Sequence, residues 1–248
     1  MNTYFNLNYE FDISTIHKRI DEQLTQASSA YITVADGVVL NNANRNANYL
    51  KAVNESMFCI CDSGYVPLYI KWIYGIRYPQ YCGAQIFKDI VTSRKYNMCF
   101  LGTNTQILDA LKANLIQYDS KIKDMLFYEL PFKSVEEFDY EGIAKMVEEA
   151  KADIIWVALG APKQDYFMNL LQKHLHHGVM LGVGAVFKFY SGLEEKRAPQ
   201  WMLNHHLEFV FRIFSEPKKQ LKRCGWIVAT LPSLLWNEWK QKNNKRNE

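Results

Sequence analysis

The chain has 248 residues, of which 48% are hydrophobic and 14% aromatic, and its formal net charge at pH 7 is +3. This composition excludes an intrinsically disordered protein, and the length allows one large domain, or one domain and an appendage, with a sizeable core. The charge is uneven: residues 196–248 hold eleven Lys and Arg against four Asp and Glu, a net of +7, so residues 1–195 carry −4. A basic C-terminal segment on a mildly acidic body indicates contact with phosphate groups of a membrane, a nucleotide or a nucleic acid.

The sequence shows no sign of export or of a membrane span. The N-terminus, Met1-Asn2-Thr3-Tyr4, lacks the basic and apolar regions of a signal peptide. The longest apolar run near the end, Trp226 to Leu235, is interrupted by Pro232 and is shorter than the ~20 residues that a span requires. We therefore expect a cytoplasmic protein that is able to sit on the inner face of the membrane.

Cysteine and histidine residues show no metal-binding pattern. Cys59 and Cys61 alternate along a predicted strand, which is typical of buried free thiols, and the C-x-x-C spacing is absent. His174, His176 and His177 lie at a predicted helix end, where histidine suits the helix dipole. We expect no metal site.

Apolar β-rich runs alternate with helical patterns from residue 29 to residue 184. The expected strands are Ala30–Val34, Met57–Cys61, Met98–Leu101, Met125–Tyr128, Ile154–Leu159 and Val179–Val183. The expected helices are Asn42–Asn54, Tyr65–Tyr74, Ala84–Ser93, Thr105–Tyr118, Val135–Ala150 (opened by a capping box of Ser134 and Glu137) and Lys163–Leu175. This alternation predicts an α/β fold: a mostly parallel, Rossmann-like sheet with helices on both faces.

Beyond residue 196 the pattern is helical only. The expected helices are Ala198–His206, Leu207–Phe214 and Pro217–Cys224, with clustered Lys and Arg. Basic amphipathic helices with interleaved Trp are typical of membrane-interface segments, but an ordinary docked helix with a solvated basic face has the same pattern, and both interpretations stay open. We therefore divide the chain into a Rossmann-like core, 1–195, and a basic helical C-terminal appendage, 196–248.

Three predicted strands end in glycine-containing loops that lead into helices. These loops are centred on Gly102-Thr103, on Gly160 to Gln164 and on Gly182 to Gly184. Such junctions direct backbone N–H groups and helix N-termini toward an anion. None matches the phosphate-loop motif or G-x-G-x-x-G, yet the three together favour a nucleotide or sugar-phosphate pocket.

Two carboxylates follow predicted strands and are candidates for a general base. Asp62 comes directly after the strand Met57–Cys61, and Asp36 follows Ala30–Val34 in the same way. Asp near Gly is also a common turn device, so the structural interpretation stays open for both. Thr33 is a possible hydrogen-bonding residue of the same region, although it also suits an ordinary strand position.

Several motifs, in order, resemble those of the WecG/TagA/CpsF glycosyltransferases over roughly residues 28–225. They are Asp62-x-Gly64, Gly102, Leu159-Gly160-Ala161-Pro162-Lys163-Gln164-Asp165, Gly182-Val183-Gly184-Ala185, Arg197-Ala198-Pro199 and Leu207-Glu208-Phe209-x-x-Arg212 with Glu216-Pro217. The resemblance implies an inverting, metal-independent hexosyltransferase without a cofactor. It would use a UDP-sugar donor, typically of N-acetylmannosamine or its uronic acid, and a polyprenyl-diphosphate-linked sugar acceptor at the cytoplasmic membrane face. That activity belongs to cell-envelope or capsular polysaccharide synthesis.

The resemblance also implies roles for individual residues. Asp62 would be the general base, Gln164 a polar contact beside the reacting sugar, and Arg212 a stabiliser of the leaving diphosphate. The implied donor-binding residues are Thr33, Gly102, Thr103, Gly160, Lys163, Gly182, Gly184, Lys188 and Arg197. Lys218, Lys219 and Arg223 would contact the membrane or the diphosphate.

The chain departs from the family pattern in three places. Ala35-Asp36 replaces the usual Asn-Pro, the segment Gln80 to Gln85 lacks the usual Arg and Asp, and Lys188 stands where an Asp is common. These departures leave the donor sugar open. They also leave open a non-catalytic nucleotide- or polyanion-binding module derived from the fold. A nucleic-acid-binding protein fits less well, because strand aromatics are sparse and the basic residues lie beyond the cleft motifs. A homo-oligomer remains possible.

Overall fold

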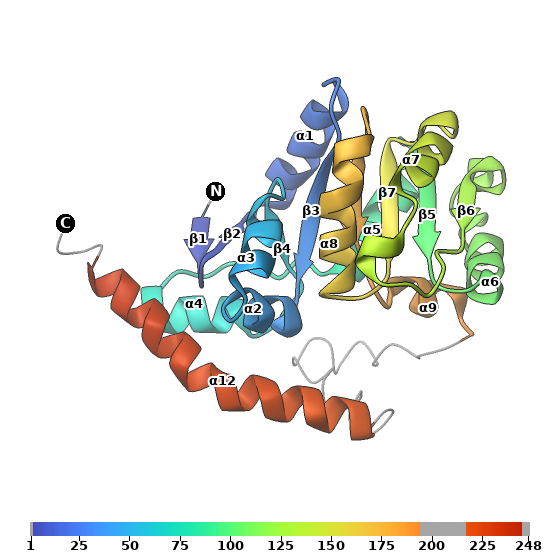
Figure 1. The fold of residues 1–248 in the computed structure, drawn as a ribbon. Coiled ribbons are helices and arrows are strands. Elements are labelled where there is room, and N and C mark those ends of the chain that lie inside the picture. The colour runs from blue at the N-terminus through green and yellow to red at the C-terminus, as the bar shows by residue number, and fades with distance from the viewer. Residues whose placement is uncertain (1, 194–216, 245–248) are drawn as a thin grey trace.

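The computed structural model describes residues 2–193 and 217–244, with the side chains of all of these except 217–224. Its centre is one eight-stranded sheet in the order β1-β2-β4-β3-β8-β7-β5-β6, in which only the β1–β2 pair is antiparallel (Figure 1). The strands are β1 (Asn2–Tyr4), β2 (Leu7–Tyr9), β3 (Ala30–Ala35), β4 (Cys59–Cys61), β5 (Met98–Gly102), β6 (Leu126–Tyr128), β7 (Ile154–Ala158) and β8 (Val179–Gly182). The predicted α/β class and its mostly parallel sheet are confirmed.

Helices cover both faces of the sheet. One face carries α1 (Ile13–Leu24), α5 (Gly83–Ser93), α6 (Thr105–Leu115) and α9 (Val186–Ser191). The other carries α2 (Gly37–Ala43), α3 (Ala47–Asn54), α4 (Val66–Tyr74), α7 (Tyr140–Glu149) and α8 (Lys163–Leu171). Short 3-10 turns occupy Ser120–Asp124, Val135–Glu137 and Gln172–His174, and α12 spans Pro217–Asn244.

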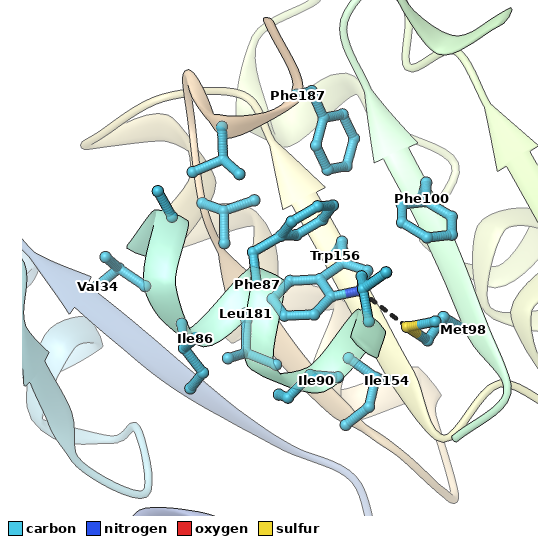
Figure 2. Packing of buried hydrophobic residues seen from close by; sticks show 14 of the residues in the cluster. Val34, Ile86, Phe87, Ile90, Met98, Phe100, Ile154, Trp156, Leu181 and Phe187 are labelled. Atoms are coloured by element: carbon cyan, nitrogen blue, oxygen red, sulfur yellow. Dashed lines mark hydrogen bonds between the residues drawn. The ribbon is translucent and has the colours of Figure 1, made fainter. Parts of the chain in front are cut away.

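The core of the first face is built on aromatic rings. Trp156 of β7 is fully buried, with its ring centre 4.8 Å from that of Phe87 on α5. Its indole N–H donates to the sulfur of Met98 at 3.4 Å, so the polar atom of a buried ring is satisfied (Figure 2). Phe100 and Phe187 extend this cluster from β5 and α9, which fixes α9 directly beyond the end of β8.

The structure corrects two of the predicted helices. The single helix expected over Asn42–Asn54 is two helices, because Asn46 adopts an extended conformation and its side chain accepts hydrogen bonds from Asn48 N and Tyr49 N, capping α3. The helix expected over Val135–Ala150 is a 3-10 turn followed by α7. The predicted capping box of Ser134 is present, but it opens only that turn.

The N-terminal hairpin is an element that the sequence did not predict. Strands β1 and β2 are three residues each and are joined by Phe5 and Asn6, both in the left-handed region with φ of 52° and 63°. Two-residue hairpins need this conformation, for which glycine is the usual signal. Here the chain uses Phe5, which is buried, and so gives no such signal.

The C-terminal prediction is wrong in length. In place of a short helix over Pro217–Cys224, α12 continues through Pro232 to Asn244 and packs against α2 and α4. The expected helices Ala198–His206 and Leu207–Phe214 lie outside the described residues. None of the helices in the described part of the chain combines the length and apolar character needed to cross a membrane.

Candidate functional site

The ends of the parallel strands bring the predicted loops to one edge of the sheet. Strands β3, β4, β5, β7 and β8 are all parallel neighbours, so the residues that follow them lie at the same edge. In Figure 1 the strand arrowheads point toward the side on which α2, α4, α9 and α12 lie. Ligands of open α/β sheets bind at this edge, which makes it the candidate site.

Asp62 lies at this edge and is held by a helix N-terminus. Its backbone N–H donates to the carbonyl of Ala35 at 3.1 Å, which continues the pairing of β3 and β4. Its Oδ1 accepts a hydrogen bond of 2.7 Å from the N–H of Gly83, the first residue of α5. The N-terminus of α5 therefore holds this carboxylate in place at the sheet edge.

Asp36, the competing carboxylate, has a local structural role. Its Oδ1 accepts from the N–H groups of Val38 and Val39 at 2.8 and 2.9 Å, so it is the N-cap of α2. Asp62, in contrast, is bound to backbone far along the chain. Both carboxylates thus contact the first residues of a helix, and the role of Asp62 as general base stays a prediction.

Gln164 joins two of the predicted loops. Its Oε1 accepts from Gly160 N at 3.1 Å and its Nε2 donates to the carbonyl of Gly182 at 3.0 Å. The side chain is 4% exposed, and a Cβ added at Gly182 would lie 3.0 Å from its Nε2. Gln164 therefore fixes the loop after β7 against the end of β8, a positioning contact. Its predicted contact with the sugar stays a prediction.

The loops themselves adopt left-handed backbone conformations. Gly102 has φ of 118° and Gly160 and Gly184 have φ of 76° and 54°. A Cβ at Gly102 would lie 2.7 Å from the carbonyl oxygen of Ala158, so β5 and β7 approach closely there. Thr103 follows with φ of 53°, an uncommon conformation for a β-branched residue and one that is concentrated at functional sites.

A buried polar group that the sequence did not single out lies on α8. Asp165 is fully buried, and its Oδ2 accepts a hydrogen bond of 2.5 Å from the hydroxyl of Tyr49 on α3. Among the described residues its Oδ1 has no hydrogen-bond partner. Burial raises the pKa of Asp165 to about 7, and the nearby Asp36 carboxylate acts in the same direction. Burial and the Asp165 charge also raise the pKa of Tyr49. The one sequence signal was its place beside Gln164.

Thr33 lies on the same face of the sheet. It is fully buried and paired in register with Cys59 of β4, whose thiol pKa is raised by burial and by the Asp165 carboxylate. Within the described part of the chain, the Thr33 hydroxyl has no hydrogen-bond partner. The structure thus places Thr33 two residues before the carboxyl end of β3, with its side chain buried.

The predicted basic residues are distributed differently. The ammonium group of Lys163 donates to the carbonyl of Lys133 and lies 5.1 Å from the centre of the Phe138 ring. Lys188 is half-buried in α9, directly after the β8 glycines. Two of the other predicted basic residues, Arg197 and Arg212, fall outside the described residues. Lys218, Lys219 and Arg223 lie in the first turns of α12, where the structure describes the backbone only.

Histidines and acidic residues do not form a metal site in the described ranges. No group of three or more His, Cys, Asp or Glu side chains there is arranged to hold a metal ion. His176 contacts Glu148 at 2.7 Å and His177 contacts Asp153 at 3.2 Å, both near the amino ends of the strands. Cys59, Cys61, Cys82 and Cys99 are free thiols.

Comparison with known proteins matches the sequence of this chain to a family. Residues 5–248 match the model of the "Glycosyl transferase WecG/TagA/CpsF family". Three similar relatives are each named "N-acetylglucosaminyldiphosphoundecaprenol N-acetyl-beta-D-mannosaminyltransferase". The protein of Bacillus subtilis strain 168 is 24% identical over 98% of this chain and 91% of its own length. That of Bacillus spizizenii strain W23 is 23% identical over 84% and 81%, and that of Staphylococcus aureus strain MW2 is 21% identical over 86% and 85%.

Proposed function

Because the chain belongs to the WecG/TagA/CpsF family of glycosyltransferases, we propose that it transfers an N-acetylmannosamine-type sugar from a UDP donor to a polyprenyl-diphosphate-linked sugar. The names of the relatives support this donor and acceptor class. The product would serve cell-envelope polysaccharide synthesis. The departures at Ala35, Gln80, Gln85 and Lys188 leave the exact hexose to be measured.

Asp62 is the proposed general base, and its contact with the N-terminus of α5 is the observation that carries the proposal. In an inverting transfer, the acceptor hydroxyl oxygen attacks the anomeric carbon while the bond from that carbon to the UDP oxygen breaks. The acceptor proton passes to the Asp62 carboxylate and UDP leaves. A fixed carboxylate at the sheet edge meets the requirement of proximity for such a base.

The donor diphosphate is proposed to lie over the loops that Gln164 joins. The backbone at Gly102, Thr103, Gly160, Gly182 and Gly184 lies at one sheet edge, where loop N–H groups suit an anion. Arg197, Arg212 and Lys188 are proposed to offset charge on the leaving UDP in place of a metal. Thr33 of β3 and Lys163, the first residue of α8, are proposed to contribute to donor binding next to these loops.

The basic C-terminal segment is proposed to face the cytoplasmic side of the membrane. Helix α12 contains six Lys and Arg but one acid, Glu238, which is 2% exposed and bonded to Phe5 N. Lys218, Lys219 and Arg223 in its first turns would meet lipid phosphates or the diphosphate of the acceptor. A peripheral location of this kind fits an acceptor that is anchored in the bilayer.

The test is UDP release from a panel of UDP-sugars with a lipid-diphosphate-linked sugar acceptor. Wild type should release UDP with one donor, and Asp62→Asn should lower kcat by about 10²- to 10⁴-fold because the base is lost. Asp109→Asn, which changes an exposed carboxylate on α6, should leave turnover unchanged. Unchanged turnover in Asp62→Asn would exclude Asp62 as the base. Binding of UDP with no donor consumed would favour the non-catalytic module.

A further inference from the structure

Helix α4 presents apolar side chains on two opposite sides. Val66, Ile70 and Ile73 are buried against the sheet and the hairpin. Leu68 and Trp72 of α4 are exposed, as is Ile76 just beyond the left-handed C-cap Gly75, and Trp72 is 76% exposed. We refer to Leu68, Trp72 and Ile76 as the α4 stripe. Surface apolar residues are normal singly, but three large ones gathered on a short helix and the turn that ends it indicate an interaction surface.

The chain segment that carries the α4 stripe has charges of one sign. Lys71 and Arg77 are exposed beside it, and the sequence has no Asp or Glu between Asp62 and Asp89. Exposed apolar and aromatic side chains next to cations in the same segment suit the surface of a bilayer with anionic headgroups.

Helix α12 lies against α4 and also has exposed aromatic side chains, while its acid is buried. The Tyr74 hydroxyl of α4 donates to the Glu238 carboxylate at 2.7 Å, and Lys242 donates to the carbonyl of Ile73. This contact buries the one acid of α12. On the exposed side of α12, Trp236 and Trp239 stack with their ring centres 5.3 Å apart. Trp is the side chain that favours the membrane interface, because its ring is apolar and its N–H is polar.

We propose that the α4 stripe, with Trp236 and Trp239 of the adjoining α12, docks the protein onto an anionic lipid bilayer. This inference rests on the proposed function, since it assigns a lipid-facing surface to the same site. Helix α4 begins four residues after Asp62, so docking through α4 sets the Asp62 edge of the sheet beside the bilayer surface. A lipid-linked acceptor diphosphate lies at that surface, within reach of the base.

The experiment is co-sedimentation of the full chain with vesicles of phosphatidylcholine, with and without phosphatidylglycerol. Wild type should bind the anionic vesicles. The triple variant Leu68→Ser, Trp72→Ser, Ile76→Ser should bind them about tenfold more weakly or worse, because its apolar contact with the acyl region is lost. Lys71→Glu with Arg77→Glu should weaken binding to the anionic vesicles alone. Phe132→Ser, which removes a fully exposed aromatic ring elsewhere, is the matched control and should bind as wild type does.

UDP release with a short-chain, water-soluble acceptor separates this inference from the proposed function. The triple variant should keep wild-type turnover in that assay and lose turnover only with acceptor embedded in vesicles. Vesicle binding without UDP release by any form would contradict the proposed function and leave the docking surface standing. Equal vesicle binding by wild type and the triple variant would overturn the docking surface. It would also be overturned if the triple variant differed from wild type only in being a monomer where wild type is an oligomer.

Discussion

At the scale of single residues, Gln164, predicted to contact the substrate, is seen in the structure to connect two loops by hydrogen bonds. Both ends of its amide are engaged, by Gly160 N and by the carbonyl of Gly182. The loops after β7 and β8 therefore depend on one buried side chain. A substitution of Gln164 should therefore alter the binding of the donor more than the chemical step.

We predict that Gln164→Glu raises KM for the UDP donor about tenfold and lowers stability by about 1–3 kcal/mol, because a carboxylate would replace the N–H donor to Gly182. Steady-state kinetics and chemical denaturation measure the two effects. Gln26→Glu, an exposed change in the loop between α1 and β3, should alter neither. A fall in kcat with KM and stability unchanged would instead indicate direct contact with the reacting sugar.

Asp165 gives a prediction for pH dependence. Its pKa is raised from 3.8 to about 7 by burial, so between these pH values the folded state holds more protons than the unfolded state. The stability contributed by Asp165 is therefore fully present below about pH 4 and is lost as the pH rises through 7, by up to about 4 kcal/mol. Asp165→Asn keeps an acceptor for Tyr49 but does not titrate.

The unfolding free energy of wild type should accordingly fall relative to that of Asp165→Asn as the pH rises from about 4 to about 7. Chemical denaturation across this range measures it. A constant difference would mean that Asp165 does not titrate in this window. Tyr49→Phe, which removes the hydroxyl donor to Asp165, should shift the transition to higher pH, because the ionised form loses a hydrogen bond.

At the scale of the elements, the parallel strands β5 and β7 decide the shape of the donor edge. They pair in register from Met98 with Ile154 to Gly102 with Ala158. At the last pair the backbones approach so closely that only glycine fits. The turn into α6 therefore depends on a residue without a side chain.

We predict that Gly102→Ala destabilises the protein by about 2–4 kcal/mol, because its Cβ meets the Ala158 carbonyl and its φ of 118° disfavours a side chain. The melting temperature measures the loss. Gly225→Ala in α12 is the matched control: a Cβ there has open space, and the helix should gain about 0.5–1 kcal/mol. Equal melting temperatures for Gly102→Ala and wild type would show that the edge is able to widen.

At the scale of the whole molecule, the two ends of the described chain are joined. Glu238 of α12 accepts from Phe5 N in the hairpin turn and from Tyr74 of α4, each at 2.7 Å. Gln241 adds a hydrogen bond of 3.0 Å to Asn6. The hairpin and α12 therefore support each other at the edge of the sheet, far from the aromatic core of Figure 2.

We predict that Glu238→Ala exposes the β1–β2 hairpin and α12 together, because the buried Phe5 N–H and Tyr74 hydroxyl lose their acceptor at a cost of about 2–4 kcal/mol. Hydrogen exchange should rise in both segments while β5, β7 and β8 stay protected. Lys240→Ala, on the exposed side of the same helix, should leave exchange unchanged. Faster exchange confined to α12 would show that the hairpin is stable by itself.

The strands of the sheet were predictable because buried parallel strands leave continuous apolar runs, and all six expected between residues 30 and 183 are present. Three of the misses have local causes. The hairpin uses Phe5 and Asn6 in place of glycine, α2 and α3 separate at Asn46, and α12 continues through Pro232. In each, tertiary packing or a cap overrides the residue preferences that a sequence pattern measures.

By itself, the sequence determined the α/β class, the glycine loops and the choice of Asp36 and Asp62 as candidate acids, because periodicity and turn chemistry are local properties. Only the tertiary structure showed what holds each acid: it placed Asp62 against the N-terminus of α5 and made Asp36 the cap of α2. It alone buried Asp165 beside Tyr49 and set the α4 stripe next to α12. Those facts depend on contacts between residues far apart in the chain, which no local pattern encodes.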